Sequence, residues 1–248
     1  MAYGLMVCDF GGNGQSDISF GNRASVVETR VNSRIRPLHY GVNYNESPLE
    51  FKLVFGAQRA LDRYELERIS MWLTGHQEYQ WLTIDQPDMS RCAFRCLITE
   101  LKPLSHGWLP VAFDATVRCD CPYAYGFPIE QEYRISGNTQ ILFRNESSVR
   151  EYWCPNLTIL PSPGVTSVRI VNRSDHGREF RLDNLPAEEL HIEVNNADGI
   201  IRELKHGFNL YDGFNTNFFR MVSGDNDLEV IGDGALIISG RFIYNVAG

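Results

Sequence analysis

The stretch Pro48-Leu-Glu-Phe-Lys-Leu-Val-Phe55 sets the fold class of this 248-residue chain. Its large apolar side chains alternate with polar or exposed positions, which is the period-two pattern of a half-buried strand: Leu49, Phe51, Leu53 and Phe55. One helix and several further strands are predicted directly after it. The stretch therefore opens a mainly β domain.

A helix is predicted over Arg63–Thr74. Asp62 is suited to be its N-cap, because the side chain can accept hydrogen bonds from free backbone N–H groups, and Glu65 follows three residues later, as in a capping box. The apolar positions of the buried face are Leu66, Ile69 and Leu73. Gly75 predicts a left-handed residue at the helix end.

Three strands follow the helix, over residues 79–84, 92–98 and 111–121. Two residues of the second strand and two of the third are cysteines that share a face: Cys92, Cys96, Cys119 and Cys121. Zinc sites usually take their thiolates from a tight turn, whereas strand neighbours project in parallel, so buried reduced thiols are favoured over a metal site.

The second half of the chain predicts a separate β domain. Pro122, Gly126 and Pro128 punctuate a join near Phe127, which divides the chain into domains 1–126 and 127–248. Short strands separated by Gly-Asp turns indicate a β-sandwich there, over residues 167–171, 190–194, 200–204, 228–231 and 235–244.

The charge balance argues against nucleic-acid recognition. The formal net charge is −8 at pH 7, and both halves are acidic, whereas a protein that grips phosphates normally carries a basic stripe. The longest apolar stretches fall short of a membrane span, and the N-terminal residues lack the basic and apolar regions of a signal peptide. We expect no membrane insertion and no export.

Catalytic signatures are missing from the sequence. It contains no Gly-x-Ser-x-Gly elbow, no His-Glu-x-x-His pair and no phosphate-binding loop, and Gly11-Gly-Asn-Gly14 fits a turn better than a dinucleotide site. Asp225, Asp227 and Asp233 stand beside glycines and could ligate calcium, but such residues are also the ordinary residues of turns. We expect a protein that is not an enzyme and that has no cofactor or metal.

The segment 22–45 alternates weakly and carries several arginines, among them Arg30, Arg34 and Arg36. It has too few apolar residues to bury a face of its own. Two interpretations remain open: an exposed strand pair at a sheet edge, or an arm that reaches a neighbouring subunit.

Several motifs together resemble the distal tail proteins of long-tailed, non-contractile bacteriophages. The motifs are the capped helix, Tyr-x-Trp-Leu-x-Ile-Asp-Gln-Pro-Asp at 79–88, the exit Cys119-Asp-Cys-Pro-Tyr-Ala-Tyr125, Phe218-Phe219, and Gly224-Asp-Asn-Asp-Leu-Glu-Val-Ile231. The resemblance covers nearly the whole chain. It implies an N-terminal β-sandwich-like domain with one α-helix and an extended hairpin arm, followed by a C-terminal galectin-like β-sandwich.

The resemblance also implies a function in the virion tail. Six copies would form a ring through the first domain, with Arg30, Arg34 and Arg36 of each arm meeting acidic groups on the next subunit. The ring would cap the tail tube and act as a hub for the tail-tip protein, the tape measure protein and receptor-binding proteins. DNA would pass through the ring without specific binding. The tail would be assembled in the cytoplasm of the bacterial host.

A glycan-binding module is the alternative function. In it, the C-terminal sandwich would recognise a cell-surface saccharide, with a pyranose face stacked on Trp153. Packing in a core or hinge is the favoured interpretation of this tryptophan, because likeness of fold does not by itself transfer sugar binding.

Overall fold

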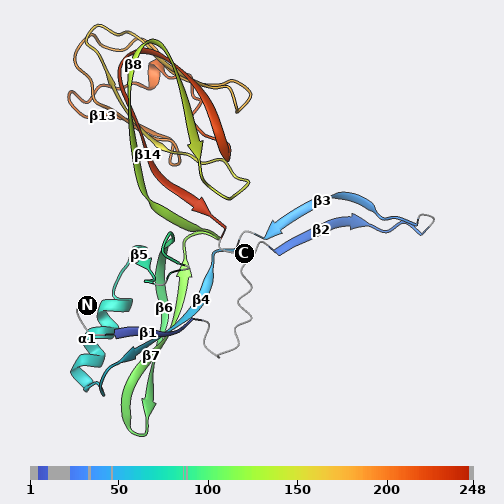
Figure 1. Ribbon diagram of the computed structural model, residues 1–248, viewed down its shortest axis with the longest axis vertical. Coiled ribbons are helices and arrows are strands. Elements are labelled where there is room, and N and C mark those ends of the chain that lie inside the picture. The colour runs from blue at the N-terminus through green and yellow to red at the C-terminus, as the bar shows by residue number, and fades with distance from the viewer. Residues whose placement is uncertain are drawn as a thin grey trace. The chain divides into compact units, whose positions relative to one another are not determined.

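The computed structural model describes residues 5–10, 23–32, 35–45, 47–85, 87 and 89–245 (Figure 1). Its packing divides the chain into two compact units, with unit 1 ending at Ala124 and also including Asn245, and unit 2 spanning Tyr125–Tyr244. Strands dominate both units, and α1 is the single α-helix among the described residues. The predicted mainly β fold is confirmed.

Unit 1 is built on one antiparallel sheet. Its strand order is β1 (Leu5–Phe10), β4 (Glu50–Ala57), β7 (Leu109–Cys119) and β6 (Ala93–His106), and β5 (Gln80–Thr83) pairs with the start of β6. The predicted strands are therefore present, although β6 runs eight residues further than expected. Its extension continues the hairpin with β7 to a tight turn at Gly107.

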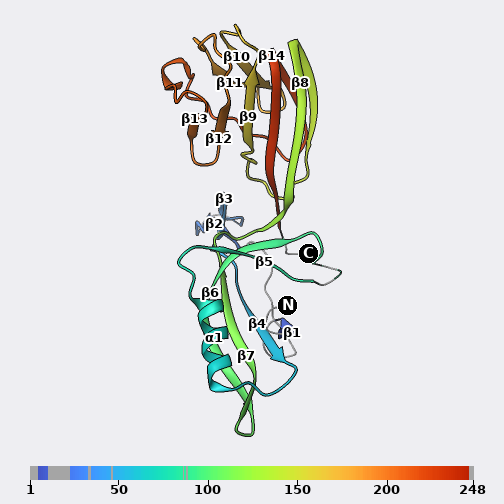
Figure 2. The same ribbon diagram turned by 90° about the vertical axis from the view of Figure 1, so that its left-hand side faces the viewer.

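The period-two alternation of β4 and β7 produces the core of unit 1. Leu53 lies opposite Ala115 in the register, and both are fully buried. The same face of the sheet carries further buried side chains from β4, β6 and β7: Phe51, Phe94, Cys96, Phe113, Val117 and Cys119. Helix α1 (Arg63–Thr74) lies along this sheet (Figure 2) and buries Ile69 against Phe113.

The start of α1 is stabilised by the predicted capping box. The backbone N–H of Glu65 donates to the Asp62 carboxylate at 2.8 Å, and the N–H of Asp62 donates to the Glu65 carboxylate at 3.1 Å. The predicted left-handed Gly75 is wrong, because its φ is −75°. Gly75 instead continues the helical bonding to the carbonyl of Met71, and a Cβ there would lie 2.4 Å from that oxygen.

A separate two-stranded ribbon, here called the arm, comprises residues 23–32 and 35–45. Its strands β2 (Arg23–Thr29) and β3 (Leu38–Asn45) pair with each other and with no other described strand (Figure 1). The interpretation of this segment as a strand pair at the edge of the main sheet is therefore wrong.

Unit 2 is a β-sandwich. Its strands are β8 (Ala124–Asn145), β9 (Asn156–Pro161), β10 (Val168–Asn172), β11 (Arg178–Leu182), β12 (Ile192–Asn195), β13 (Ile200–Glu203) and β14 (Gly224–Tyr244), with a short 3-10 helix η1 (Tyr211–Gly213). The sequence patterns missed β8, β9 and β11. One continuous cluster of apolar side chains from these strands fills the space between the sheets.

Strand β14 joins the two sheets of the sandwich. Residues 228–231 pair with β10, whereas residues 234–239 pair with β9. The strand changes sheets at Gly232 and Gly234, whose φ values of 147° and 138° lie in the region that favours glycine. A Cβ on Gly234 would also lie 2.2 Å from the carbonyl oxygen of Leu160. This bend therefore requires glycine for both conformation and space.

Gly234→Ala should lower the free energy of unfolding of unit 2 by about 3 kcal/mol or more, because backbone strain and a steric clash add. Gly164→Ala is the matched control, since Gly164 also has a positive φ, 88°, but has open space around it. Its cost should be about 1–2 kcal/mol. Urea denaturation followed by the fluorescence of Trp153 measures both, and equal losses would contradict the role assigned to Gly234.

Candidate interaction surfaces

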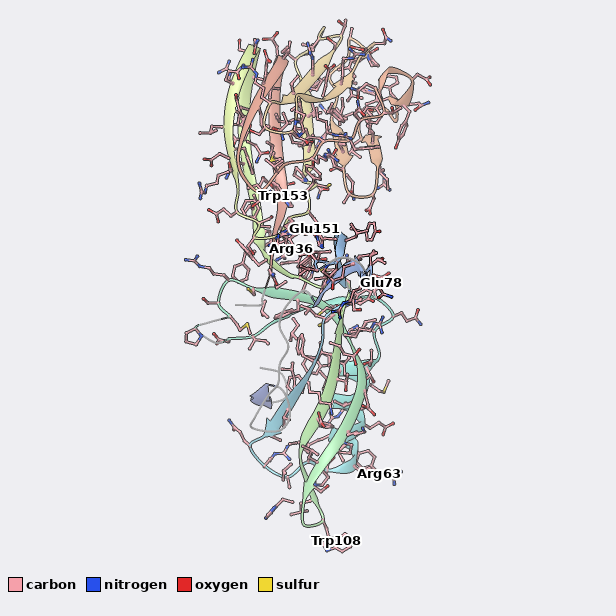
Figure 3. The ribbon with its side chains drawn as sticks, turned by 90° about the vertical axis from the view of Figure 1, so that its right-hand side faces the viewer. Arg36, Arg63, Glu78, Trp108, Glu151 and Trp153 are labelled. Carbon is pink, nitrogen blue, oxygen red and sulfur yellow. The ribbon has the colours of Figure 1, made fainter. Side chains whose placement is uncertain are left out.

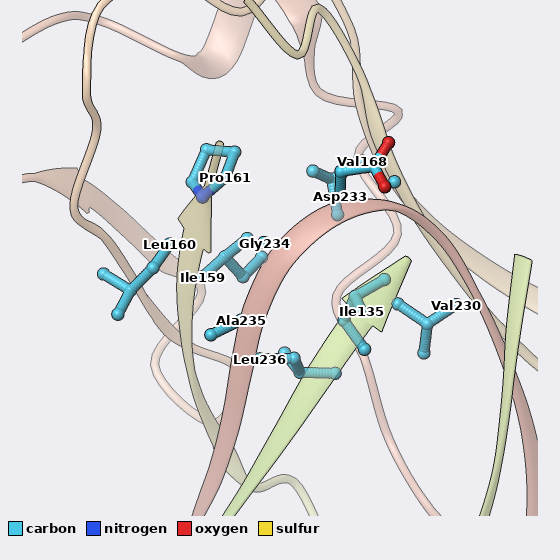
Figure 4. A pocket seen from close by; sticks show the side chains of 11 residues that line it. Ile135, Ile159, Leu160, Pro161, Val168, Val230, Asp233, Gly234, Ala235 and Leu236 are labelled. Atoms are coloured by element: carbon cyan, nitrogen blue, oxygen red, sulfur yellow. The ribbon is translucent and has the colours of Figure 1, made fainter. Parts of the chain in front are cut away.

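One concave feature of unit 2 lies at the bend of β14 and has little room for a ligand. A pocket at the bend of β14 is lined mainly by apolar side chains, including Ile135, Val168 and Leu236 (Figure 4). Its volume of about 10 Å³ corresponds to about one water molecule. Within the described residues, no group of three or more His, Cys, Asp or Glu side chains is placed to hold a metal ion.

The acidic turn residues of unit 2 are engaged in structural contacts. A carboxylate oxygen of Asp225 lies 3.2 Å from the guanidinium of Arg144. The carboxylate of Asp233 accepts a hydrogen bond of 3.0 Å from the backbone N–H of Gly137. The Gly137 contact joins the turn of β8 to β14, and the Arg144 contact joins the end of β8 to the start of β14. At Asp227, the backbone N–H donates to the hydroxyl of Ser174 at 3.1 Å.

Four cysteines of unit 1 lie in or beside its core and form no disulfide with one another: Cys92, Cys96, Cys119 and Cys121. Cys96 lies directly opposite Cys119 in the β6–β7 register, and both are buried. Burial, with a smaller contribution from the charge of Asp120, raises the pKa of the Cys96 thiol to about 11. The pKa of the Cys119 thiol is raised even more than that of Cys96. Burial is the main cause, and the neighbouring thiols of Cys96 and Cys121 contribute less. The two side chains therefore behave as neutral, apolar core residues.

Cys96 and Cys119 should resist alkylation in the native protein. At pH 8 they should react with iodoacetamide at least about 100-fold more slowly than in urea, because burial suppresses both the thiolate and access to it. Peptide mapping by mass spectrometry measures the extent of labelling at each cysteine. Rapid native labelling of either residue would contradict this arrangement.

Trp153, the residue considered for saccharide stacking, lies in the core of unit 2 (Figure 3). It is 3% exposed, and its indole N–H donates to the carbonyl of Arg241 at 2.8 Å. Its ring stacks with Phe143 at a centroid distance of 5.7 Å and contacts Phe242 at 4.9 Å. No face of the ring is therefore presented to a sugar.

A buried carboxylate organises the loop after β13. Glu203 is 6% exposed and accepts hydrogen bonds of 2.6–3.1 Å from the backbone N–H groups of His191, Lys205, His206 and Gly207. Burial by itself raises the pKa of this carboxyl group, but the four hydrogen bonds outweigh it and lower the pKa to about 2. Glu203 therefore serves the structure of the loop, with its acceptor capacity used by the backbone.

Glu203→Gln should lower the free energy of unfolding of unit 2 by about 2 kcal/mol at pH 7, because an amide cannot satisfy four donors. The folded-state pKa is depressed, so the wild-type advantage is complete above the ordinary value of 4.5 and is lost as the pH falls toward 2. Urea denaturation should show a constant difference in free energy of unfolding between the two proteins from pH 7 to pH 5. The difference should become smaller below pH 5. A difference in free energy of unfolding that does not change with pH would exclude the charged Glu203 carboxylate as its source.

Of the three arginines proposed for subunit contact, two lie on the arm and one lies outside the described residues. Arg30 and Arg36 are exposed, and Arg36 is labelled in Figure 3, whereas Arg34 lies outside the described residues. The structure brings Arg30 and Arg36 onto one two-stranded ribbon. It also shows apolar side chains of the same ribbon in solvent, including Val26, Tyr40 and Val42.

Sequence reasoning missed the exposed aromatic residues of unit 1. Tyr64 and Trp72 lie on the solvent side of α1, and Trp108 is 99% exposed at the β6–β7 turn (Figure 3). The signal for the helix residues was present in the sequence. Tyr64 and Met71 are seven residues apart, so they share a face, and that face is opposite to the one that carries Ile69.

None of the helices formed by the described residues has the length and apolar character needed to cross a membrane.

This architecture, two β-rich units with a separate β-ribbon, resembles that of solved proteins from phage tails. The chain aligns with the Dit (gp 19.1) protein of phage SPP1 at a TM-score of 0.68 and 10% identity. The alignment covers 96% of this chain and 93% of that one. The SPP1 structure is described as a paradigm of the hub adsorption apparatus of phages infecting Gram-positive bacteria. Two structures of the activated baseplate of phage P2, with calcium and with strontium, align at TM-scores of 0.54 and 0.53 and 12% identity, covering 95% and 96% of this chain and 90% of each neighbour.

Family models identify both halves of the chain. Residues 1–121 match the family described as "Phage tail protein N-terminal domain", and residues 123–239 match "Phage tail C-terminal domain". The chain belongs to this family of phage tail proteins, and the resemblance to distal tail proteins is confirmed. No curated protein matches the chain significantly.

Proposed function

We propose that this protein is a distal tail protein that forms a six-membered ring through its first domain, residues 1–126, and acts as the hub of the tail tip. The phage tail family and the hub fold support the assignment. The observation that carries the ring is the arm, because its apolar side chains and arginines are exposed. The role is structural rather than catalytic.

The arm explains how a ring can close. An isolated two-stranded hairpin is marginally stable in water, so a ribbon of this kind requires a surface to pack on. If the arm of each copy binds a different surface on the next copy, the contact is heterologous, and repeated contacts of that type generate a closed ring when the rotation between copies closes. Arg30, Arg34 and Arg36 would then meet acidic groups on the neighbouring subunit.

The ring would connect several tail components. The tail tube protein would bind on one side and the tail-tip protein on the other, with the tape measure protein inside and receptor-binding proteins attached to the galectin-like domains, residues 127–248. The formal net charge of −8 suits a channel through which DNA passes without specific binding. Assembly would take place in the host cytoplasm.

The triple variant Arg30→Glu, Arg34→Glu, Arg36→Glu should stop ring formation, because it reverses the charge of the arm at a surface that must meet carboxylates. Light scattering across a concentration series measures the assembly state. The circular dichroism spectrum should stay unchanged, because Arg30 and Arg36 are exposed.

The matched control makes the same change in net charge at exposed positions of unit 2, with Arg134→Glu, Arg202→Glu, Leu142→Glu and Leu204→Glu. This control should assemble like the wild type. An intact ring in the arm variant, or equal loss of assembly in the control, would refute the role given to the arginines of the arm.

A further inference from the structure

Helix α1 presents an apolar stripe to solvent. Tyr64, Met71 and Trp72 are 74%, 69% and 50% exposed, and Arg68 is the charged residue among them. At 3.6 residues per turn, positions 64, 68, 71 and 72 share one side of the helix. Tyr64 and Met71 lie roughly 140–160° around the helix from the buried Ile69, and Trp72 lies at the edge of the stripe nearest to it, so the stripe is not part of the core of unit 1.

Such a stripe is unusual on the solvent side of a helix. A surface helix ordinarily buries one apolar face and presents charged or polar residues on the other. Exposed apolar side chains that gather in one place, bordered by polar ones, mark binding surfaces for other proteins. Here Glu67 borders the stripe as an exposed carboxylate. The helix therefore has a second surface suited to a protein partner.

The arm carries a matching apolar surface. Val26 and Val42 lie directly opposite each other in the β2–β3 register, and they are 57% and 38% exposed. Tyr40, which is 65% exposed, stands at the register shift beside Gly41, whose φ is 142°. A paired valine surface extended by a tyrosine is the kind of face that a β-ribbon buries.

The arm does not bury this surface within its own copy. Strands β2 and β3 pack closely on each other, and no other described element packs against either strand to a comparable extent. The stripe and the arm surface have similar lengths. Tyr64 to Trp72 spans about 12 Å along a helix, and Leu38 to Val42 spans about 14 Å along a strand.

We propose that the arm of one copy lies across α1 of the next copy, with Val26, Tyr40 and Val42 against the stripe of Tyr64, Met71 and Trp72. The inference rests on the ring proposed above and identifies the surface that receives the arm. Glu67 beside the stripe supplies a carboxylate for Arg30 or Arg36, and Glu28 of the arm supplies one for Arg68. The docking surface is thus apolar at its centre and charged at its border.

Two variants test the contact from its two sides. The helix variant Tyr64→Glu, Met71→Glu places charges in the stripe with residues that favour a helix, so α1 should keep its circular dichroism signal. The arm variant Val26→Glu, Val42→Glu places like charges at paired positions of the ribbon. The matched control, Leu142→Glu, Leu204→Glu, makes the same chemical change at exposed leucines of unit 2.

Each variant alone should associate with itself at least about 100-fold more weakly than the wild type, because charges would be buried at the centre of the contact. The control should assemble normally. A 1:1 mixture of the two variants should form a dimer and nothing larger, since the helix variant keeps an intact arm and the arm variant keeps an intact stripe. Sedimentation velocity measures all five samples: the wild type, the two variants, the control and the mixture.

The outcomes separate this inference from the proposed ring. A helix variant that assembles like the wild type would overturn the inference and leave the ring standing, with the stripe available to another tail protein. Two monomeric variants that form no mixed dimer would also overturn it. An arm variant that assembles like the wild type, or a wild type that stays monomeric at every concentration, would overturn both.

Discussion

The arm imposes the constraint on which the rest of the account depends. Its two strands pair with each other and expose the Val26–Val42 pair, and a ribbon of two strands cannot remove such side chains from water by itself. The apolar clusters of unit 1 are formed by its sheet, by α1 and by the adjoining loops, and none of the described arm side chains belongs to them. In the proposed ring the next copy would bury the arm, so assembly would be driven by the same hydrophobic effect that folds the two units.

The core of unit 1 could be predicted from the sequence, because its signals are local. Alternation in β4 identifies Leu53 as buried, and Asp62 with Glu65 fixes the first turn of α1 through hydrogen bonds made within four residues. The family resemblance rested largely on motifs of the same unit, together with Phe218-Phe219 and residues 224–231 of unit 2. The reduced, core-like character of Cys96 also followed from its place on one face of a strand.

The remaining features depend on tertiary contacts. Strand β8 contains Gly126 and Pro128, which read as breakers, and β11 is mostly charged, so neither shows a clear pattern. Weak alternation in segment 22–45 could not tell an edge pair from a free ribbon, because both are exposed. The stripe of α1 was visible in the sequence as Tyr64 and Met71 on the face away from the predicted Ile69, but the exposure of these side chains depends on which other elements cover the helix.

Amide hydrogen exchange of residues 23–32 and 35–45, measured by mass spectrometry in monomeric and assembled protein, tests the central claim most directly. The account predicts little protection of these amides in the monomer and strong protection in the assembly, because the ribbon is stabilised by the neighbouring copy. Amides of β7 should be protected in both and serve as the internal reference. Equal protection of the arm in the two states would contradict the account.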